Sequence, residues 1–110
     1  MEIPEIDVAE LAARQGDGVA LIDVRTPKEF ADARVPGAHL IPLAEVVERI
    51  EEVPTEGTVY VICARGPRSA KAVEHYRSQG IDAVNVAGGT VAWMDAGLPI
   101  DRAGSEAEGD

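Results

Sequence analysis

The chain has 110 residues, of which 45% are hydrophobic and 27% charged, and its net charge is −10. This length suits one domain with a hydrophobic core. The negative charge argues against a nucleic acid or an anionic membrane as partner, because both would repel the protein.

The sequence predicts no membrane-spanning segment, no signal peptide and no metal site. We find no apolar run long enough for a transmembrane helix, and the acidic start lacks the basic and apolar regions of a signal peptide. We therefore expect a cytoplasmic protein. The single cysteine excludes an internal disulfide and a cysteine-rich zinc site. His39 and His75 lie far apart and are interpreted as surface or packing residues, so we expect no metal and no cofactor.

Residues 1–103 are predicted to form a single domain. The remaining segment, residues 104–110, is acidic and contains no large apolar side chain. A segment of this composition cannot bury enough surface to fold. We expect it to be a disordered tail.

The first third of the domain shows two helix starts around one strand. Asp7 is placed to cap the first helix, which Gly16 is expected to end in a left-handed conformation. Residues 19–24 are almost continuously apolar, which is typical of a buried strand. Thr26 then begins a capping box, followed by a proline at the first helical position, which predicts a helix over residues 27–33.

The same alternation continues along the rest of the domain. The predicted strands are residues 39–41, 58–62 and 83–86, and the predicted helices are residues 43–52, 68–79 and 90–96. Alternating strands and helices indicate an α/β fold, with a mainly parallel sheet and helices on both faces. In such sheets ligands bind beyond the carboxyl ends of the strands, and Cys63 lies at one such end.

A lone cysteine is usually a small buried hydrophobe, but three features favour a reactive thiolate at Cys63. It lies where a strand meets a loop. The loop contains Gly66 and leads into a helix, so backbone N–H groups can form a cradle for an anion. Arg65 and Arg68 add two positive charges in an otherwise acidic protein. Each feature stabilises the thiolate, which is the nucleophilic form.

Each neighbour also has a simpler interpretation. Gly66 can be an ordinary turn glycine, and each arginine a solvated surface charge. Ser69 can donate to the anion, but we favour its role as the cap of the following helix. No histidine is placed to act as a base, so a cysteine–histidine dyad is unsupported. A reaction that needs little proton transfer fits Cys63 better.

Three groups of segments resemble the rhodanese homology domain of the single-domain sulfurtransferase type, and together they span residues 6–100. The first signature resembles residues 21–30, 35–38 and 41–43. The active-site loop matches residues 63–70, and the closing signature resembles residues 85–93 and 97–100. All three occur in the family's order, which makes the resemblance specific.

The resemblance implies a three-layer α/β fold with a central five-stranded sheet. It also implies that Cys63 takes the outer sulfur of thiosulfate or a related donor as a persulfide. A thiol, or cyanide in vitro, would accept this sulfur. The partners are then a small sulfur-donor anion and a thiol acceptor, and a sulfur-relay protein stays open as a further partner. Backbone N–H groups from Ala64 to Ser69, Gly66 among them, would hold the anionic sulfur.

Two pairs of charged residues acquire expected roles from the resemblance. Arg65 and Arg68 would attract or position the donor. Asp23 and Arg25 match a pair near the family's site, for which we favour a structural ion pair as a supporting role.

The chain departs from the family pattern at two places. Pro67 stands where the family usually has a free N–H, so the cradle has one donor fewer. Ala33-Arg34 precedes Val35 where Gly-His is common, which puts little of the function in doubt. Trp93 is expected in the core.

Two other functions compete with sulfur transfer. Cysteine phosphatases use a longer loop with arginine six residues after the cysteine, whereas this chain has Ser69 at that position and Arg68 one residue earlier. Loop length therefore favours sulfur over phosphate. A non-catalytic role, as a sulfur-relay or regulatory binding module, is the other alternative.

Overall fold

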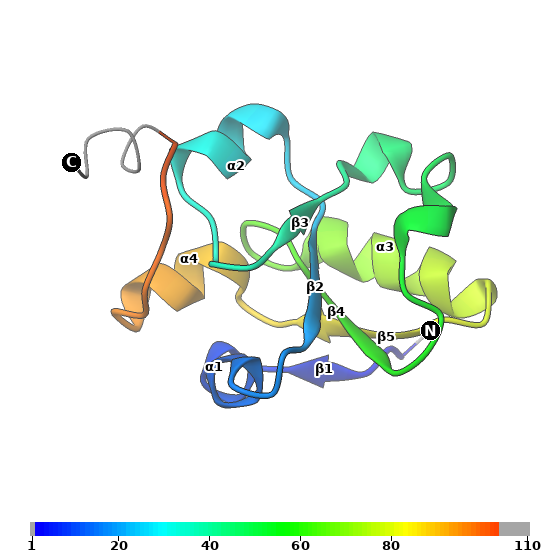
Figure 1. The fold of residues 1–110 in the computed structure, drawn as a ribbon, viewed down its shortest axis with the longest axis horizontal. Coiled ribbons are helices and arrows are strands. Elements are labelled where there is room, and N and C mark those ends of the chain that lie inside the picture. Colours follow the sequence, from blue (N-terminus) through cyan, green and yellow to red (C-terminus); the bar gives the residue numbers. More distant parts are fainter. Residues whose placement is uncertain (1, 104–110) are drawn as a thin grey trace.

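The computed structural model describes residues 2–103, so the predicted tail at residues 104–110 lies outside the described residues. Strands and helices follow each other along the chain (Figure 1). The strands are β1 (Glu5–Ile6), β2 (Ala20–Asp23), β3 (His39–Leu40), β4 (Thr58–Ile62) and β5 (Asp82–Val86). The helices are α1 (Val8–Gln15), α2 (Pro27–Asp32), α3 (Pro67–Ser78) and α4 (Gly89–Asp95), with two 3₁₀ helices, η1 (Leu43–Glu45) and η2 (Ile50–Glu52).

The strands form one five-stranded sheet in the order β1-β5-β4-β2-β3. Within residues 2–103, every ladder between these strands is parallel. The central strand is β4, which pairs with β2 on one side and β5 on the other. The predicted α/β fold is therefore confirmed, and Cys63 follows its central strand.

Helices cover both faces of the sheet, as the alternation of side chains along β4 shows. Val59 and Val61 belong to a core cluster with residues of α3, whereas Tyr60 and Ile62 belong to a second cluster with residues of α1 and α4. Trp93 of α4 is 1% exposed in the second cluster, which confirms its expected place in the core. Helix, sheet and helix thus form three layers (Figure 1).

The predicted helix over residues 43–52 is wrong. The structure has only the short 3₁₀ helices η1 and η2 in this stretch, with a turn between them. The apolar spacing still buries Val46, and Val53 lies in the same core cluster. The stretch contains several β-branched residues, which lose side-chain freedom in an α-helix, and this favours the shorter turns.

Smaller differences occur near the start of the chain. Asp7 caps α1 as predicted, because its carboxylate accepts from the Glu10 N–H at 2.9 Å. Gly16, however, has φ −62°, so its predicted left-handed conformation is wrong. The two-residue strand β1 was not predicted, because a strand so short has no recognisable alternation.

No helix within residues 2–103 combines the length and the apolar character that crossing a membrane requires.

The amino-terminal end of α4 holds the backbone that follows β4. The Thr90 N–H and hydroxyl donate to the Cys63 carbonyl at 2.9 and 3.1 Å. The Val91 N–H donates to the Ala64 carbonyl at 3.0 Å. These bonds use amide groups that a helix start leaves without partners. The approach requires glycine at position 89, where φ is +60° and an added Cβ would overlap both carbonyl oxygens.

We expect Gly89→Ala to destabilise the protein more than Gly97→Ala. Gly97 also has a positive φ, but an added Cβ there would meet no atom within 4 Å. The control should therefore cost only the backbone strain, about 1 kcal/mol. The overlap at position 89 should add roughly 1–3 kcal/mol, measured as free energy of unfolding in urea. Equal losses in the two variants would contradict the close approach.

Candidate functional site

Cys63 lies in the loop that joins β4 to α3, at the carboxyl end of the central strand. Its side chain is buried, with 1% exposure. The loop turns back at Gly66, whose φ of +127° is a conformation that few residues other than glycine adopt. This turn brings the start of α3 over the sulfur. The sequence-predicted strand-end position is the observed one.

Two hydrogen-bond donors lie close to the Cys63 sulfur. The Gly66 N–H donates to Sγ at 3.0 Å, and the Ser69 Oγ lies 3.3 Å from Sγ. Burial raises the pKa of Cys63, but the Ser69 hydroxyl and the backbone N–H groups of Ser69, Gly66 and Arg65 outweigh this effect. The net result is a pKa below the ordinary value of a thiol, so the site favours an anionic sulfur.

Ser69 does not cap α3, so the favoured prediction for this residue is wrong. The N-cap of α3 is Gly66, which makes no side-chain capping bond. Ser69 lies within the first turn and is fully buried. Its hydroxyl contacts the Cys63 sulfur, the Gly66 carbonyl at 3.0 Å and the Asn85 Oδ1 at 2.6 Å. The turn at Gly66 directs this side chain inward, toward the Cys63 sulfur.

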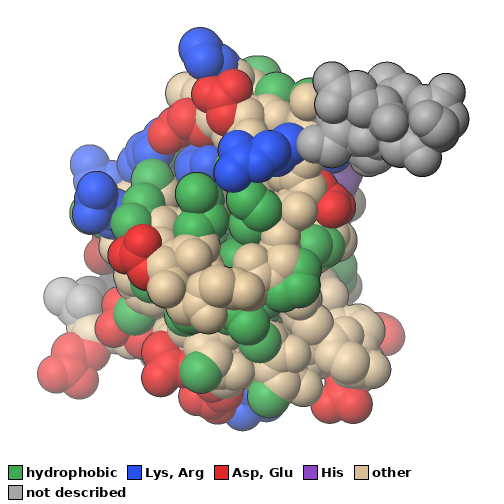
Figure 2. Space-filling view, turned by 90° about the vertical axis from the view of Figure 1, so that its left-hand side faces the viewer, with side chains coloured by type: hydrophobic (Ala, Val, Ile, Leu, Met, Phe, Trp, Pro, Cys, Tyr) green, Lys and Arg blue, Asp and Glu red, His purple; other side chains and the backbone are tan. Residues whose placement is uncertain are grey.

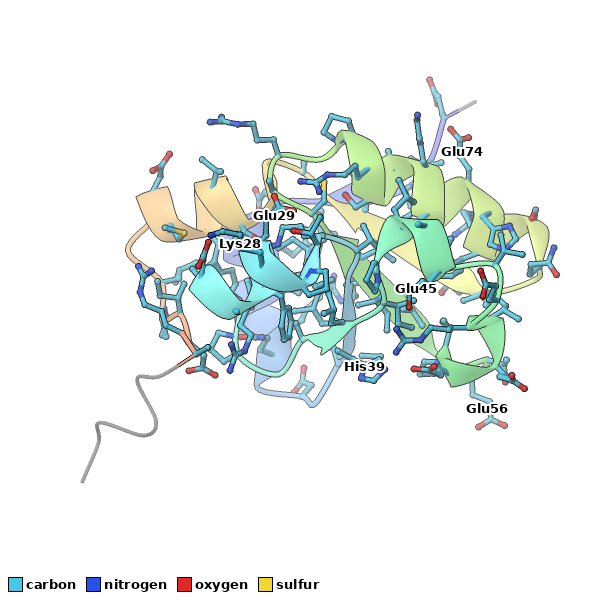
Figure 3. All side chains as sticks on the ribbon, turned by 90° about the horizontal axis from the view of Figure 1, so that it is seen from above. Lys28, Glu29, His39, Glu45, Glu56 and Glu74 are labelled. Atoms are coloured by element: carbon cyan, nitrogen blue, oxygen red, sulfur yellow. The ribbon has the colours of Figure 1, made fainter. Side chains whose placement is uncertain are left out.

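Arg68 is engaged by an acidic partner from another element. Its two terminal nitrogens donate to the two Glu29 carboxylate oxygens at 2.8 and 2.9 Å. Glu29 also completes the predicted capping box with Thr26 at the start of α2. Figure 3 shows Glu29 between α2 and the start of α3. The Arg65 side chain, by contrast, is exposed, and no hydrogen bond or ion pair joins its guanidinium to another residue in the described range 2–103.

The Arg68 guanidinium holds the pKa of Glu29 at about 2, well below the usual range of a glutamate. Burial opposes this effect, and hydrogen bonds from Thr26 support it. The Arg68 pKa is raised in turn by the same partner. Much of the Arg68 charge is therefore neutralised before any ligand arrives, and Arg65 is the cation of the loop that remains available.

Asp23 and Arg25 form the expected ion pair at the carboxyl end of β2. Arg25 Nη2 lies 2.8 Å from Asp23 Oδ2, and Arg25 Nε lies 3.0 Å from Oδ1. Both side chains are buried, with exposures of 0% and 6%. Arg25 also donates to the Ala33 carbonyl at 2.7 Å, which joins the end of α2 to the sheet. A buried, fully bonded pair of this kind fits the structural role favoured from the sequence.

The histidines lie elsewhere. His39 is exposed and bonded to Glu52 at 2.9 Å, and the His75 ring lies 6.1 Å from that of Tyr76. In the described part of the chain, no group of three histidine, cysteine or acidic residues is arranged to hold a metal ion.

Three residues near the loop were missed by sequence reasoning. The sequence indicates Glu29 only as the third helical residue of the capping box that begins at Thr26. Asn85 is a polar residue within an otherwise apolar strand and is 2% exposed, which is a signal that could have identified it. Glu5 precedes α1 and contacts Asn85 only because β1 pairs with β5. Each contact depends on elements that are distant in sequence.

Fold and site together define a compact α/β domain that holds one cysteine sulfur in a loop of anion-stabilising donors. The model of the rhodanese-like domain family matches residues 7–96, and the chain belongs to this family.

Similar proteins cover almost the whole domain. A protein of Allochromatium vinosum named sulfurtransferase is 38% identical over 101 residues, covering 89% of this chain and 94% of the relative. A putative sulfurtransferase of Bacillus subtilis, YtwF, is 35% identical over 95 residues, covering 84% and 92%. The crystal structure of a rhodanese-related protein from Thermoplasma volcanium superposes with a TM-score of 0.84 at 32% identity, covering 89% and 97%.

We expect Glu29→Gln to remove part of the acid dependence of stability. Glutamine can keep the capping box but loses the ion pair with Arg68. Because the folded pKa of Glu29 is depressed to about 2, its stabilisation is present above its ordinary pKa and is lost as the pH falls toward 2. The pair is about one-third exposed, so the loss at neutral pH should be about 1 kcal/mol or less.

The control is Asp32→Asn, which removes the exposed ion pair with Lys28 on the same helix. Urea unfolding at several pH values measures both variants. A Glu29→Gln protein with the wild-type pH profile of stability would contradict the assigned ion pair.

Proposed function

We propose that the protein is a sulfurtransferase that carries a sulfane sulfur as a persulfide on Cys63. The observation that carries this proposal is the buried sulfur, 1% exposed, with the Gly66 N–H at 3.0 Å and the Ser69 hydroxyl at 3.3 Å. The pKa of the thiol is lowered by these donors, and no histidine hydrogen-bonds to Cys63 within residues 2–103. The site thus favours a nucleophile that needs no separate base.

The proposed reaction has two steps that use the same sulfur. The Cys63 thiolate attacks the outer sulfur of thiosulfate, a new S–S bond forms, and sulfite leaves with the electron pair of the broken S–S bond. A thiolate acceptor then attacks the terminal persulfide sulfur, and the Cys63 thiolate leaves. After each step a sulfur atom in the loop carries negative charge, first the outer persulfide sulfur and then the Cys63 thiolate, and this is the charge that the donors of the loop stabilise.

The surface charge supports an anionic donor. The chain has a net charge of −10. Even so, many of the basic side chains on the face shown in Figure 2 lie together in the upper part of that face. This is the side of the molecule that carries α2 and α4 (Figure 1). The exposed Arg65 is well placed to attract the donor, whereas Arg68 is paired with Glu29 and would act mainly on the loop.

The same pairing disfavours a cysteine phosphatase. Such an enzyme needs an arginine free to hold the phosphate oxygens, and here the nearest candidate, Arg68, already donates to both oxygens of Glu29. The position six residues after Cys63 is Ser69. A relay protein that receives persulfide without using thiosulfate differs from the proposal only in its donor, so kinetics must separate the two.

We expect thiosulfate:cyanide sulfurtransferase turnover that disappears in Cys63→Ser. Serine keeps a similar size but is a far weaker nucleophile at neutral pH, so loss should be at least a thousandfold. A melting curve shows whether the variant is folded. Turnover that survives in Cys63→Ser would contradict the role of this sulfur, and a wild-type protein without turnover would favour the relay.

We expect Pro67→Ala to raise turnover. Pro67 is the first residue of α3 and lacks an N–H, and one donor directed at an anion is worth about 3 kcal/mol. The gain should therefore reach up to about a hundredfold. Pro54→Ala, at an exposed position away from the loop, is the matched control. An unchanged rate in Pro67→Ala would show that an N–H at this position does not point at sulfur.

A further inference from the structure

A chain of polar contacts runs from the surface at β1 to the Cys63 sulfur. The Asn85 Nδ2 donates to the Glu5 carboxylate at 2.8 Å, and the Asn85 Oδ1 lies 2.6 Å from the Ser69 Oγ. The Ser69 Oγ lies 3.3 Å from the Cys63 Sγ. Glu5 is exposed, whereas Asn85, Ser69 and Cys63 are 2%, 0% and 1% exposed. The parallel register of β1 and β5 places Glu5 beside Asn85.

The direction of each hydrogen bond follows from the chemistry of the groups. An ionised carboxylate has no proton to donate, so Asn85 must present its Nδ2 to Glu5. The Asn85 Oδ1 then faces Ser69 and can only accept. The single hydroxyl proton of Ser69 therefore goes to Asn85, at the shortest of its three contacts. While the hydroxyl proton is donated to Asn85, it is not available to the sulfur.

We propose that Asn85 is a positioning residue that competes with Cys63 for the Ser69 proton, and that Glu5 fixes the amide orientation that makes Asn85 a competitor. While Cys63 is a thiol, its S–H can donate to a lone pair of the Ser69 oxygen. When the sulfur carries negative charge, the hydroxyl proton is drawn toward it by a charge-assisted bond. Asn85 thereby limits how strongly Ser69 stabilises the anionic sulfur.

This role deepens the proposed function, since it concerns the same sulfur. Other charges near Cys63 do not depend on the chain of contacts. Arg68 interacts with the Cys63 charge and is paired with Glu29, and Asp23 is paired with Arg25. Arg65 lies beside the sulfur in sequence, and its N–H supports the thiolate. Substitutions at Asn85 and Glu5 leave these five groups in place.

The expected result is a lower Cys63 pKa in Asn85→Leu, by about one unit, because the Ser69 proton is released to the sulfur. Glu5→Gln should shift the pKa in the same direction, since glutamine can donate and so no longer fixes the Asn85 amide. Ser69→Ala should raise the pKa. The readout is a pH titration of thiolate ultraviolet absorbance, which does not require access to the buried sulfur, with Cys63→Ser as blank.

Two controls separate this role from simple charge. Glu2→Gln removes one negative charge from the same exposed segment. Glu5→Gln is also placed in the Ser69→Ala background, where the proposal predicts no further shift and an effect of charge would persist. The comparison of Glu5→Gln with and without Ser69→Ala does not depend on whether Asn85→Leu folds.

An unchanged or raised Cys63 pKa in both Glu5→Gln and folded Asn85→Leu would overturn the proposal, as would a Glu5→Gln shift that survives without the Ser69 hydroxyl. The titration is independent of sulfur transfer. A protein with the predicted shifts but no turnover would therefore count against the proposed function alone.

Discussion

The sulfur of Cys63 is buried and at the same time surrounded by hydrogen-bond donors, and the rest of the site depends on the balance between these two effects. Burial alone would raise the pKa of the thiol. The Gly66 N–H at 3.0 Å and the neighbouring donors outweigh this effect, so that the net pKa lies below the ordinary value. A small shift in the loop would leave the burial and remove the donors, so the loop must be held firmly.

The fold provides this support from several directions. The central strand β4 ends immediately before Cys63 and so places it at the carboxyl edge of the sheet. The start of α4 then binds the carbonyl groups of Cys63 and Ala64, at a distance that only a glycine at position 89 permits. On the opposite side of the loop, the ion pair of Arg68 with Glu29 joins the start of α3 to α2. The donors around the sulfur are thus positioned by three helices and one strand.

The parts of the site that could be predicted are those formed by residues that are close together in the sequence. Cys63 and its loop could be identified because the strand end, the glycine and the arginines follow one another within a few positions. Contacts between distant segments could not. The Arg68–Glu29 pair joins residues 39 positions apart, and the Asn85–Glu5 contact joins residues 80 positions apart. Only the parallel pairing of strands brings them together.

Where local signals compete, sequence reasoning chose the wrong one in two places. Ser69 is a residue type that often caps helices, but α3 begins at Pro67, so Ser69 is its third residue and its side chain contacts the sulfur. The apolar spacing of residues 43–52 indicates a helix, but the stretch forms two short 3₁₀ helices, which bury Val46 and leave Val47 63% exposed. At Ser69, tertiary contacts override a local preference, whereas in residues 43–52 the cost of β-branched residues in an α-helix outweighs the apolar spacing.

The central claim is that Cys63 carries sulfur, and the mass of the intact protein tests it most directly. After incubation with thiosulfate and removal of the excess, the account predicts a gain of one sulfur atom that a thiol reductant reverses. Because Cys63 is the single cysteine of the chain, Cys63→Ser should show no gain. A wild-type protein that takes up no sulfur from thiosulfate or from any other sulfane donor would contradict the account.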